Sequence, residues 1–304
     1  MPNILPREKK IEVLRHLVEG NTLRSTSRLT GVHRTTIQNL LVSFGSRCAD
    51  FMDRKLRGLT LDHIEVDEIW TFVAKKQSRL TIDERAERSD VGDVYVWYGV
   101  DAQTKLAPSF IVGKRNADNA RRLMVDLRSR LAGNPNPHAS DAHAFKAGGY
   151  KPIVQISTDG FAAYPEAVDL AFGPYVKFGT IVKDYKNANM IYTPSEMVGT
   201  KRRGVYGIDE HETRMICTSH VERANLTMRT LLKRFTRLSL GFSKKLENLE
   251  AACAMYFAFY NFVWRTRHTD QSGKSGRLRP TPAMMAGVTD RLWSFEDLYD
   301  AVNA

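Results

Sequence analysis

The sequence predicts an α/β protein in which a helical N-terminal segment precedes a sheet of mixed strand direction. Apolar residues recur at helical spacing between Arg7 and Phe44. From residue 61 onward, segments rich in Val, Ile, Tyr, Trp and Phe alternate with amphipathic segments, in the order three strands, helix, strand, helix, strand. We therefore expect two domains: residues 1–60, helical and ending in a basic connector (MDRKLRGL), and residues 61–304.

The N-terminal segment predicts a helix-turn-helix. Ile11, Leu14 and Leu17 share one face of a first helix, and Asn21 and Thr22 can cap a second. Gly31 suits the tight turn before a third helix, whose buried side would hold Val32, Ile37 and Leu40. Its outward side chains, of types that contact base edges and phosphates, are Arg34, Thr35, Gln38 and Asn39. The alternative is a three-helix scaffold that binds nothing.

The charge of the chain favours a polyanionic partner. It has 45 Lys and Arg against 34 Asp and Glu, a formal net charge of +11. Residues 1–60 alone hold 11 basic and 5 acidic residues, an excess of 11 − 5 = 6. Nucleic acid is the leading candidate for such a partner. The three cysteines form no C-x-x-C pair, and no apolar run is long enough to cross a bilayer, so we expect neither a zinc ribbon nor a membrane protein.

The larger segment divides into elements by its hydrophobic pattern. Strands are expected at 64–74, 94–102, 106–113, 153–158 and 175–185, and helices at 117–131 and 161–172. The polar stretch 133–151 is expected to be a surface insertion, and 187–218 to be irregular. Two long helices follow, one beginning near His220 and one running from about Ser243 to Trp264.

Three carboxylates stand where their segments have no structural need of an acid. Asp67 interrupts an apolar strand, Asp159 follows another strand, and Glu222 lies near the start of a basic helix. Because ligands collect at strand ends in α/β sheets, Asp159 can face an acid on a neighbouring strand. Each also has a plainer explanation. Asp67 could be a solvated residue on an exposed face, Asp159 could belong to an Asp-Gly turn, and Glu222 could be an acid favoured by the helix dipole. By strand alternation, Glu68 is expected to point away from Asp67.

The helix that Glu222 heads is otherwise basic. Residues 223–245 hold seven Lys and Arg and no acid. At 100° per residue, Arg229 and Lys233 share the face of Glu222, which predicts a stripe that holds DNA phosphates. The far side of the helix is expected to be buried, with Met228, Leu231, Leu232, Phe235 and Leu238.

Three carboxylates without Cys or His partners suit two Mg²⁺ or Mn²⁺ ions rather than zinc. Two such ions activate a nucleophile and stabilise a leaving oxygen in phosphoryl transfer. We therefore predict that Asp67, Asp159 and Glu222 are both metal ligands and catalytic residues. His220 could assist, although a lone histidine is more often a surface or hydrogen-bonding residue.

The chain resembles transposases of bacterial insertion sequences, in particular those of the insertion-sequence-one group. The segments that carry the resemblance are VDEIWTFVAKK, GDVYVWYGVDAQTKLAPSFIVGKR, STDGFAAY, SHVERANLTMRTLLKRFTRLSLGFSKKLEN and RPTPAMMAGVTDRLW. It implies a ribonuclease H-like domain with a DDE triad at Asp67, Asp159 and Glu222, and a basic residue seven places after the Glu, at Arg229. It also implies a bacterial, cytoplasmic, nucleoid-associated enzyme that acts on double-stranded DNA ends as a homo-oligomer.

The expected function is metal-dependent cleavage and strand transfer at the ends of a mobile element. Two alternatives remain open from the residues. One is a non-catalytic DNA-binding protein derived from a transposase, and the other is a nuclease without joining activity, which would have the same metal site.

Overall fold

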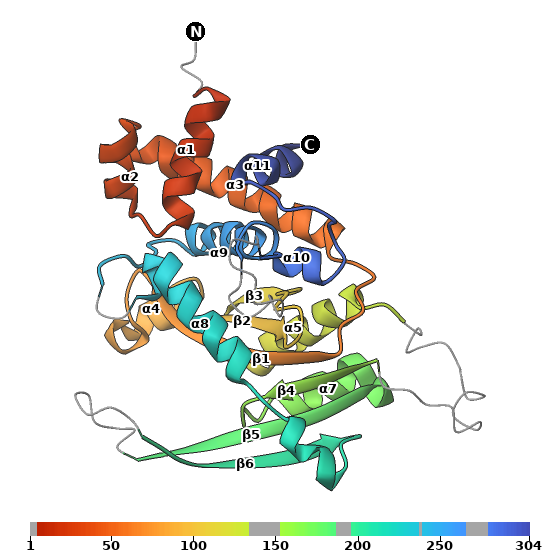
Figure 1. Ribbon diagram of the computed structural model, residues 1–304. Coiled ribbons are helices and arrows are strands. Elements are labelled where there is room, and N and C mark those ends of the chain that lie inside the picture. Colours follow the sequence, from red (N-terminus) through yellow and green to blue (C-terminus); the bar gives the residue numbers. More distant parts are fainter. Residues whose placement is uncertain (1–4, 134–152, 187–195, 237–238, 266–278) are drawn as a thin grey trace.

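The computed structural model describes residues 5–133, 153–186, 196–236, 239–265 and 279–304 (Figure 1). The predicted insertion at 133–151 lies outside these residues except for Gly133. The N-terminal part contains α1 (Arg7–Val18), α2 (Leu23–Thr30) and α3 (Arg34–Lys55). No described helix combines the length and the apolar character needed to cross a membrane.

The predicted turn between α2 and α3 is present. The side chain of Thr22 caps α2 by accepting a hydrogen bond from the Ser25 amide, at 3.1 Å. Gly31 ends the helix with φ +72°, a left-handed conformation that residues with a Cβ adopt at a cost. Leu41, and not Leu40, joins Val32 and Ile37 in the core. Because α3 continues to Lys55, the first residues of the expected connector are its last turn.

Six strands form one mixed sheet in the order β3-β2-β1-β4-β5-β6. The first three, β1 (His63–Val73), β2 (Gly92–Asp101) and β3 (Phe110–Gly113), are an antiparallel meander, as predicted. Next, β4 (Val154–Thr158) lies parallel to β1, and β5 (Val176–Lys186) lies parallel to β4. The expectation of an irregular chain at 187–218 is wrong in part, because β6 (Glu196–Tyr206) pairs antiparallel with β5.

Helices cover both faces of the sheet. The helices α5 (Ala117–Arg130) and α7 (Tyr164–Phe172) lie on one face, and α8 (Ser219–Leu231) and α9 (Leu246–Phe262) lie on the other. Adjacent residues of β2 show the two layers. Trp97 packs on Tyr164 of α7 at 6.0 Å between ring centroids, and Tyr98 packs on Phe257 of α9 at 5.1 Å.

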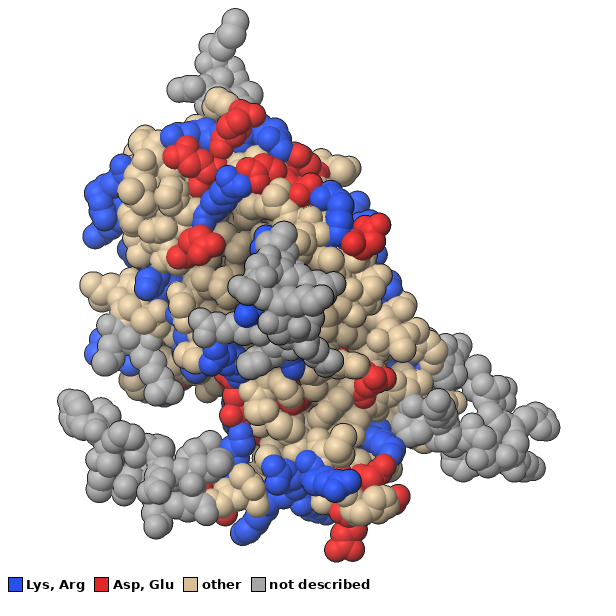
Figure 2. Space-filling view, in the orientation of Figure 1, with Lys and Arg blue, Asp and Glu red and all other residues tan. Residues whose placement is uncertain are grey.

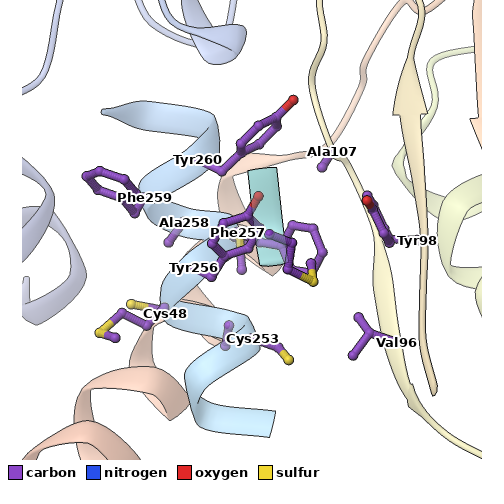
Figure 3. Packing of buried hydrophobic residues seen from close by; sticks show 14 of the residues in the cluster. Cys48, Val96, Tyr98, Ala107, Cys253, Tyr256, Phe257, Ala258, Phe259 and Tyr260 are labelled. Carbon is purple, nitrogen blue, oxygen red and sulfur yellow. The ribbon is translucent and has the colours of Figure 1, made fainter. Parts of the chain in front are cut away.

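The core continues from the sheet into the N-terminal helices through α9, whose residues are buried on almost every side. Figure 3 shows α9 between Cys48 of α3 and Val96 and Tyr98 of β2. A Cβ at Gly45 of α3 would lie 2.3 Å from the Ala251 carbonyl oxygen, so only glycine allows this approach of α3 to α9. One cluster of buried side chains therefore includes residues on both sides of residue 60. The division into two domains at that residue stays a prediction.

Shorter elements complete the described chain. They are the 3₁₀ turns η1 (Gln77–Arg79), η2 (Gly173–Tyr175), η3 (Glu210–Met215) and η4 (Lys233–Phe235), and the helices α4 (Ile82–Glu87), α10 (Pro282–Met285) and α11 (Phe295–Asn303). Phe44 of α3 stacks on Tyr299 of α11 at 5.5 Å, so the C-terminal helix adds to the core of the N-terminal part.

Candidate metal centre

The sheet brings Asp67 and Asp159 together where β1 and β4 separate. These parallel strands pair only from His63 to Glu65 on β1, opposite Gln155 to Ser157 on β4. Asp67 lies two residues beyond the last pair, and Asp159 directly follows β4. Because the pairing stops just before Asp67 and β4 ends just before Asp159, the two carboxylates meet at this opening of the sheet, in the middle of β1.

Glu68 joins these two acids. One carboxylate oxygen from each of Asp67, Glu68 and Asp159 lies within 4.8 Å of the others. Among the described residues, these three side chains form the group that could hold a metal ion. Glu68 was expected to point away from Asp67, but its carboxylate lies close to that of Asp67 in this group. Its backbone alternates with that of Asp67, but β1 has no partner strand on this side beyond Glu65, so the longer side chain can reach Asp159 around the open edge.

Glu222 lies near this group but outside it. It is exposed in the first turn of α8, where it accepts a hydrogen bond from Thr218 Oγ1 at 2.8 Å and forms an ion pair with Lys183 of β5. One turn further along α8, Asn225 Nδ2 donates to Asp67 Oδ2 at 2.7 Å. This hydrogen bond ties α8 to β1 beside the acidic group.

Glu65 fixes the start of α8, a role that the sequence analysis missed. Its carboxylate is fully buried on β1 and accepts hydrogen bonds from the amides of His220 and Val221, at 2.7 and 3.1 Å. The ring Nδ1 of His220 lies 2.6 Å from the same carboxylate. Burial raises the pKa of Glu65, but the hydrogen bonds from His220 and Val221 outweigh it and leave the pKa below its ordinary value. His220 therefore helps to hold the helix through Glu65, and it is not a member of the group of Asp67, Glu68 and Asp159.

Two acids of the group have raised pKa values. Burial raises the pKa of Asp67 to about 6, and the charges of Asp159 and Glu222 add to this effect. Burial also raises the pKa of Glu68 to about 7, with a further contribution from Asp159. A cation that enters the group would stabilise the charged form of both carboxylates.

Arg115 is the internal cation of the group and was also missed. It follows β3, and its guanidinium donates to Glu68 Oε1 at 3.2 Å and to Asp159 Oδ2 at 3.4 Å. The guanidinium carbon lies 4.1 Å from the centroid of the Phe161 ring, which limits where Arg115 can move. Arg115 and Lys183 thus each bind acids that a metal ion would need.

The geometry fits a hard divalent cation. Magnesium takes oxygen ligands at about 2.0–2.1 Å in an octahedron, which places those oxygens roughly 3–4 Å apart. Oxygens of Asp67, Glu68 and Asp159 that lie within 4.8 Å of one another need little movement to reach this spacing. No sulfur or imidazole ligand belongs to the group, as magnesium or manganese prefers.

The predicted stripe of cations on one helix is corrected by the structure. The helix α8 ends at Leu231, so the helical angle used for Lys233 does not apply. Lys233 is exposed in η4, whereas Arg229 is half-buried on α8. Burial of Met228, Leu231, Leu232 and Phe235 agrees with the prediction, and Leu238 lies outside the described residues.

The proposed DNA-reading residues lie at the start of α3. Arg34, Thr35 and Asn39 are exposed, and Gln38 is half-buried. Arg34 is the first residue of the helix, where His33 Nδ1 accepts a hydrogen bond from the Thr35 amide at 3.3 Å. Their role in DNA recognition stays a prediction.

A comparison with protein families supports a transposase role. The family model of IS1 transposases matches residues 187–263, about a quarter of the chain. The matched part includes Lys201–Arg203 on β6, Glu222 and α9. A comparison with curated proteins gives no match. The chain is thus similar to IS1 transposases over the segment that carries the third predicted acid.

Proposed function

We propose that this chain is a DDE transposase that cuts the ends of a mobile DNA element and joins the freed 3′-hydroxyl to a target. The observation that carries the proposal is the meeting of Asp67 and Asp159 at the point where β1 and β4 stop pairing, beside the helix that bears Glu222. That helix lies inside the segment similar to IS1 transposases.

Asp67, Asp159 and Glu222 would hold two Mg²⁺ or Mn²⁺ ions, which activate the attacking hydroxyl and stabilise the leaving oxygen. Asp67 is oriented by Asn225, and Asp159 by its hydrogen bond from the Phe161 amide at 3.0 Å. Glu222 becomes available when Lys183 releases it. Glu68 would hold Arg115 and tune the charge of the group from its buried position, at 2% side-chain exposure.

The double-stranded DNA ends are the proposed substrate, and the chain is proposed to act on them as a homo-oligomer. Exposed cations support this partner. Figure 2 shows Lys and Arg gathered over the edge of the molecule formed by β5 and β6, where Lys201, Arg202 and Arg203 are exposed. Phosphate contacts of this kind position a duplex without reading its sequence.

The start of α3 is the proposed reader of the element's ends. Replacing Arg34 or Gln38 by alanine should relax sequence preference, with a loss of about 1–3 kcal/mol of discrimination for a direct base contact. Competition binding between the element's own end and random duplex DNA measures this loss. Unchanged discrimination in both variants would remove α3 from the reader role.

The test of the catalytic role is a cleavage and strand-transfer assay with Mg²⁺ on DNA that carries the element's ends. Asp67→Asn, Asp159→Asn and Glu222→Gln should each abolish both steps while end binding is retained, because each removes charge without changing size. Asp169→Asn, an exposed acid on α7, is the matched control and should be fully active.

The same assay separates the alternatives. Cleavage without joining would identify a nuclease, and binding without either step in the unaltered chain would identify a non-catalytic DNA-binding protein. Full activity of any one of the three acid variants removes that residue from the site.

A further inference from the structure

A groove runs between the N-terminal helices and the segment that joins α8 to α9. Its cavity has a volume of about 680 Å³. Residues at the start of α2 and α3 form one wall, and residues 232–234, 239–242 and 244 supply the other. The bottom includes the buried residues Leu41, Ala252 and Met255.

The charge of this groove is all of one sign. Among the described lining residues, none is Asp or Glu, and five are Lys or Arg: Arg24, Arg34, Lys233, Arg234 and Lys244. The α3 helix also begins here, so its unpaired amides and its dipole add positive potential. An anion would therefore be attracted to both walls.

Four of these cations have no acidic partner within the described parts of the chain: Arg24, Arg34, Lys233 and Lys244. Some exposed cations elsewhere do have acidic partners, as Arg7 has Asp300 and Arg15 has Glu296, whereas others, such as Lys245, have none in those same parts. The fifth, Arg234, donates to Ser243 Oγ at 2.6 Å and shapes the wall. The exposed four are thus placed for an anion that the chain does not supply.

We propose that this groove holds one sugar-phosphate strand of a DNA duplex, so that the N-terminal helices and the segment before α9 grip the same strand. This inference rests on the proposed function. A volume of about 680 Å³ falls within the range of ligand pockets and suits a short stretch of one strand rather than the full width of a duplex. Thr35 and Gln38 on the same wall would lie beside the bases of that strand.

The groove is hydrogen-bonded to the strand that carries Asp67. Thr71 Oγ1 donates to the carbonyl of Arg234 at 2.9 Å, and the Ala74 amide donates to the carbonyl of Ser243 at 2.8 Å. The wall that contains Lys233 and Lys244 is therefore fixed to the end of β1, a few residues beyond Asp67. The wall formed by the start of α2 and α3 is held by the packing of α3 on α9. A strand held between them would keep a constant distance to the acids.

Two neighbouring lysines supply the sharpest test. Lys244 and Lys245 are both exposed, but only Lys244 lines the groove. In the full chain, binding of a fluorescent random-sequence duplex is measured over a range of salt concentrations. Lys244→Ala should lower the slope of log affinity against log salt by about one unit, and Lys245→Ala should leave it nearly unchanged. Arg24→Ala and Arg28→Ala form a second such pair on α2.

Hydroxyl-radical footprints on a duplex that carries the element's end, where binding has a defined register, test whether one strand is shared. Arg24→Ala and Lys244→Ala come from opposite walls, so both should lose protection at the same few nucleotides of one strand. Equal salt slopes for Lys244→Ala and Lys245→Ala would overturn the groove. Losses on separate segments would overturn the shared strand. Neither measurement needs catalysis, so a chain that binds in this way but does not cleave would refute only the proposed function.

Discussion

Replacement of Glu65 tests whether a buried acid on β1 places the helix that bears Glu222. In Glu65→Leu, the side chain keeps roughly its size but loses every acceptor. The amides of His220 and Val221, at the N-terminus of α8, then lose the partner that they reach at 2.7 and 3.1 Å. An unsatisfied buried donor costs about 1–3 kcal/mol, so two of them should lower the free energy of unfolding by about 2–6 kcal/mol.

Glu65→Gln is the matched variant. Both amides bind the same carboxylate oxygen, Oε2, so the single carbonyl oxygen of glutamine can accept from both. The amide nitrogen of glutamine can donate to His220 Nδ1 if the proton of the ring moves to Nε2. What is lost is the charge at the N-terminus of α8, which contributes about 0.3–1 kcal/mol.

Urea unfolding followed by fluorescence measures both effects, and the strand-transfer assay reports the position of Glu222. We expect Glu65→Leu to be strongly destabilised and nearly inactive even where it remains folded, and Glu65→Gln to keep most activity. Glu212→Gln, in a half-buried ion pair with Lys177, is a control for the loss of an acid. If Glu65→Leu costs less than about 1 kcal/mol, the hydrogen bonds to α8 do not hold it.

Three further predictions concern cations and packing. Lys183→Met should release Glu222 and tighten Mn²⁺ binding in the absence of DNA, by at most about fivefold, because a partly exposed ion pair contributes under about 1 kcal/mol; weaker binding, read by titration, would contradict this. Arg115→Gln should destabilise the metal-free chain and make thermal unfolding more sensitive to Mg²⁺ than in the unaltered chain, since repulsion between Glu68 and Asp159 is then uncompensated; an unchanged response would contradict it. Gly45→Ala should cost about 1–3 kcal/mol in urea unfolding by forcing α3 away from α9, and no loss would mean that the helices can separate.

The sheet and most helices could be predicted because their residues follow simple periods. The strand 64–74 and the helix 117–131 were expected within a residue or two of β1 and α5. The edge strand β6 was missed because its Lys201–Arg203 run and its glycines look like a loop. Charged residues on an edge strand prevent pairing with other chains, so the same residues that hide a strand from prediction also suit its position.

The acids, like the strands and helices, include some whose place could be predicted and some whose place could not. That Asp159 would lie near an acid on a neighbouring strand could be predicted because strand ends in an α/β sheet gather ligands, whereas the metal-binding role of Asp67 and Asp159 stays a prediction. The place of Glu68 depends on where β4 stops pairing with β1, which only the tertiary structure defines. Glu65 shares the face of Asp67 by alternation, and an acid buried in an apolar strand is a signal that it caps or binds something. The end of α8 at Leu231 carries no glycine or proline, so the sequence contains no sign of it.

The position of Glu222 depends on contacts of two kinds that act in opposite directions. Glu65 and Asn225 hold α8 against β1 through buried hydrogen bonds, so they bring the helix to the acids. Lys183 binds the carboxylate of Glu222 on β5 and keeps the side chain outside the group of Asp67, Glu68 and Asp159. In the proposed function, the backbone of the site would therefore be in place before DNA binds, and Glu222 would approach the other acids once Lys183 releases it. Since a partly exposed ion pair is weak, a divalent cation and a DNA phosphate together can replace it, with the phosphate taking Lys183 as the metal takes Glu222.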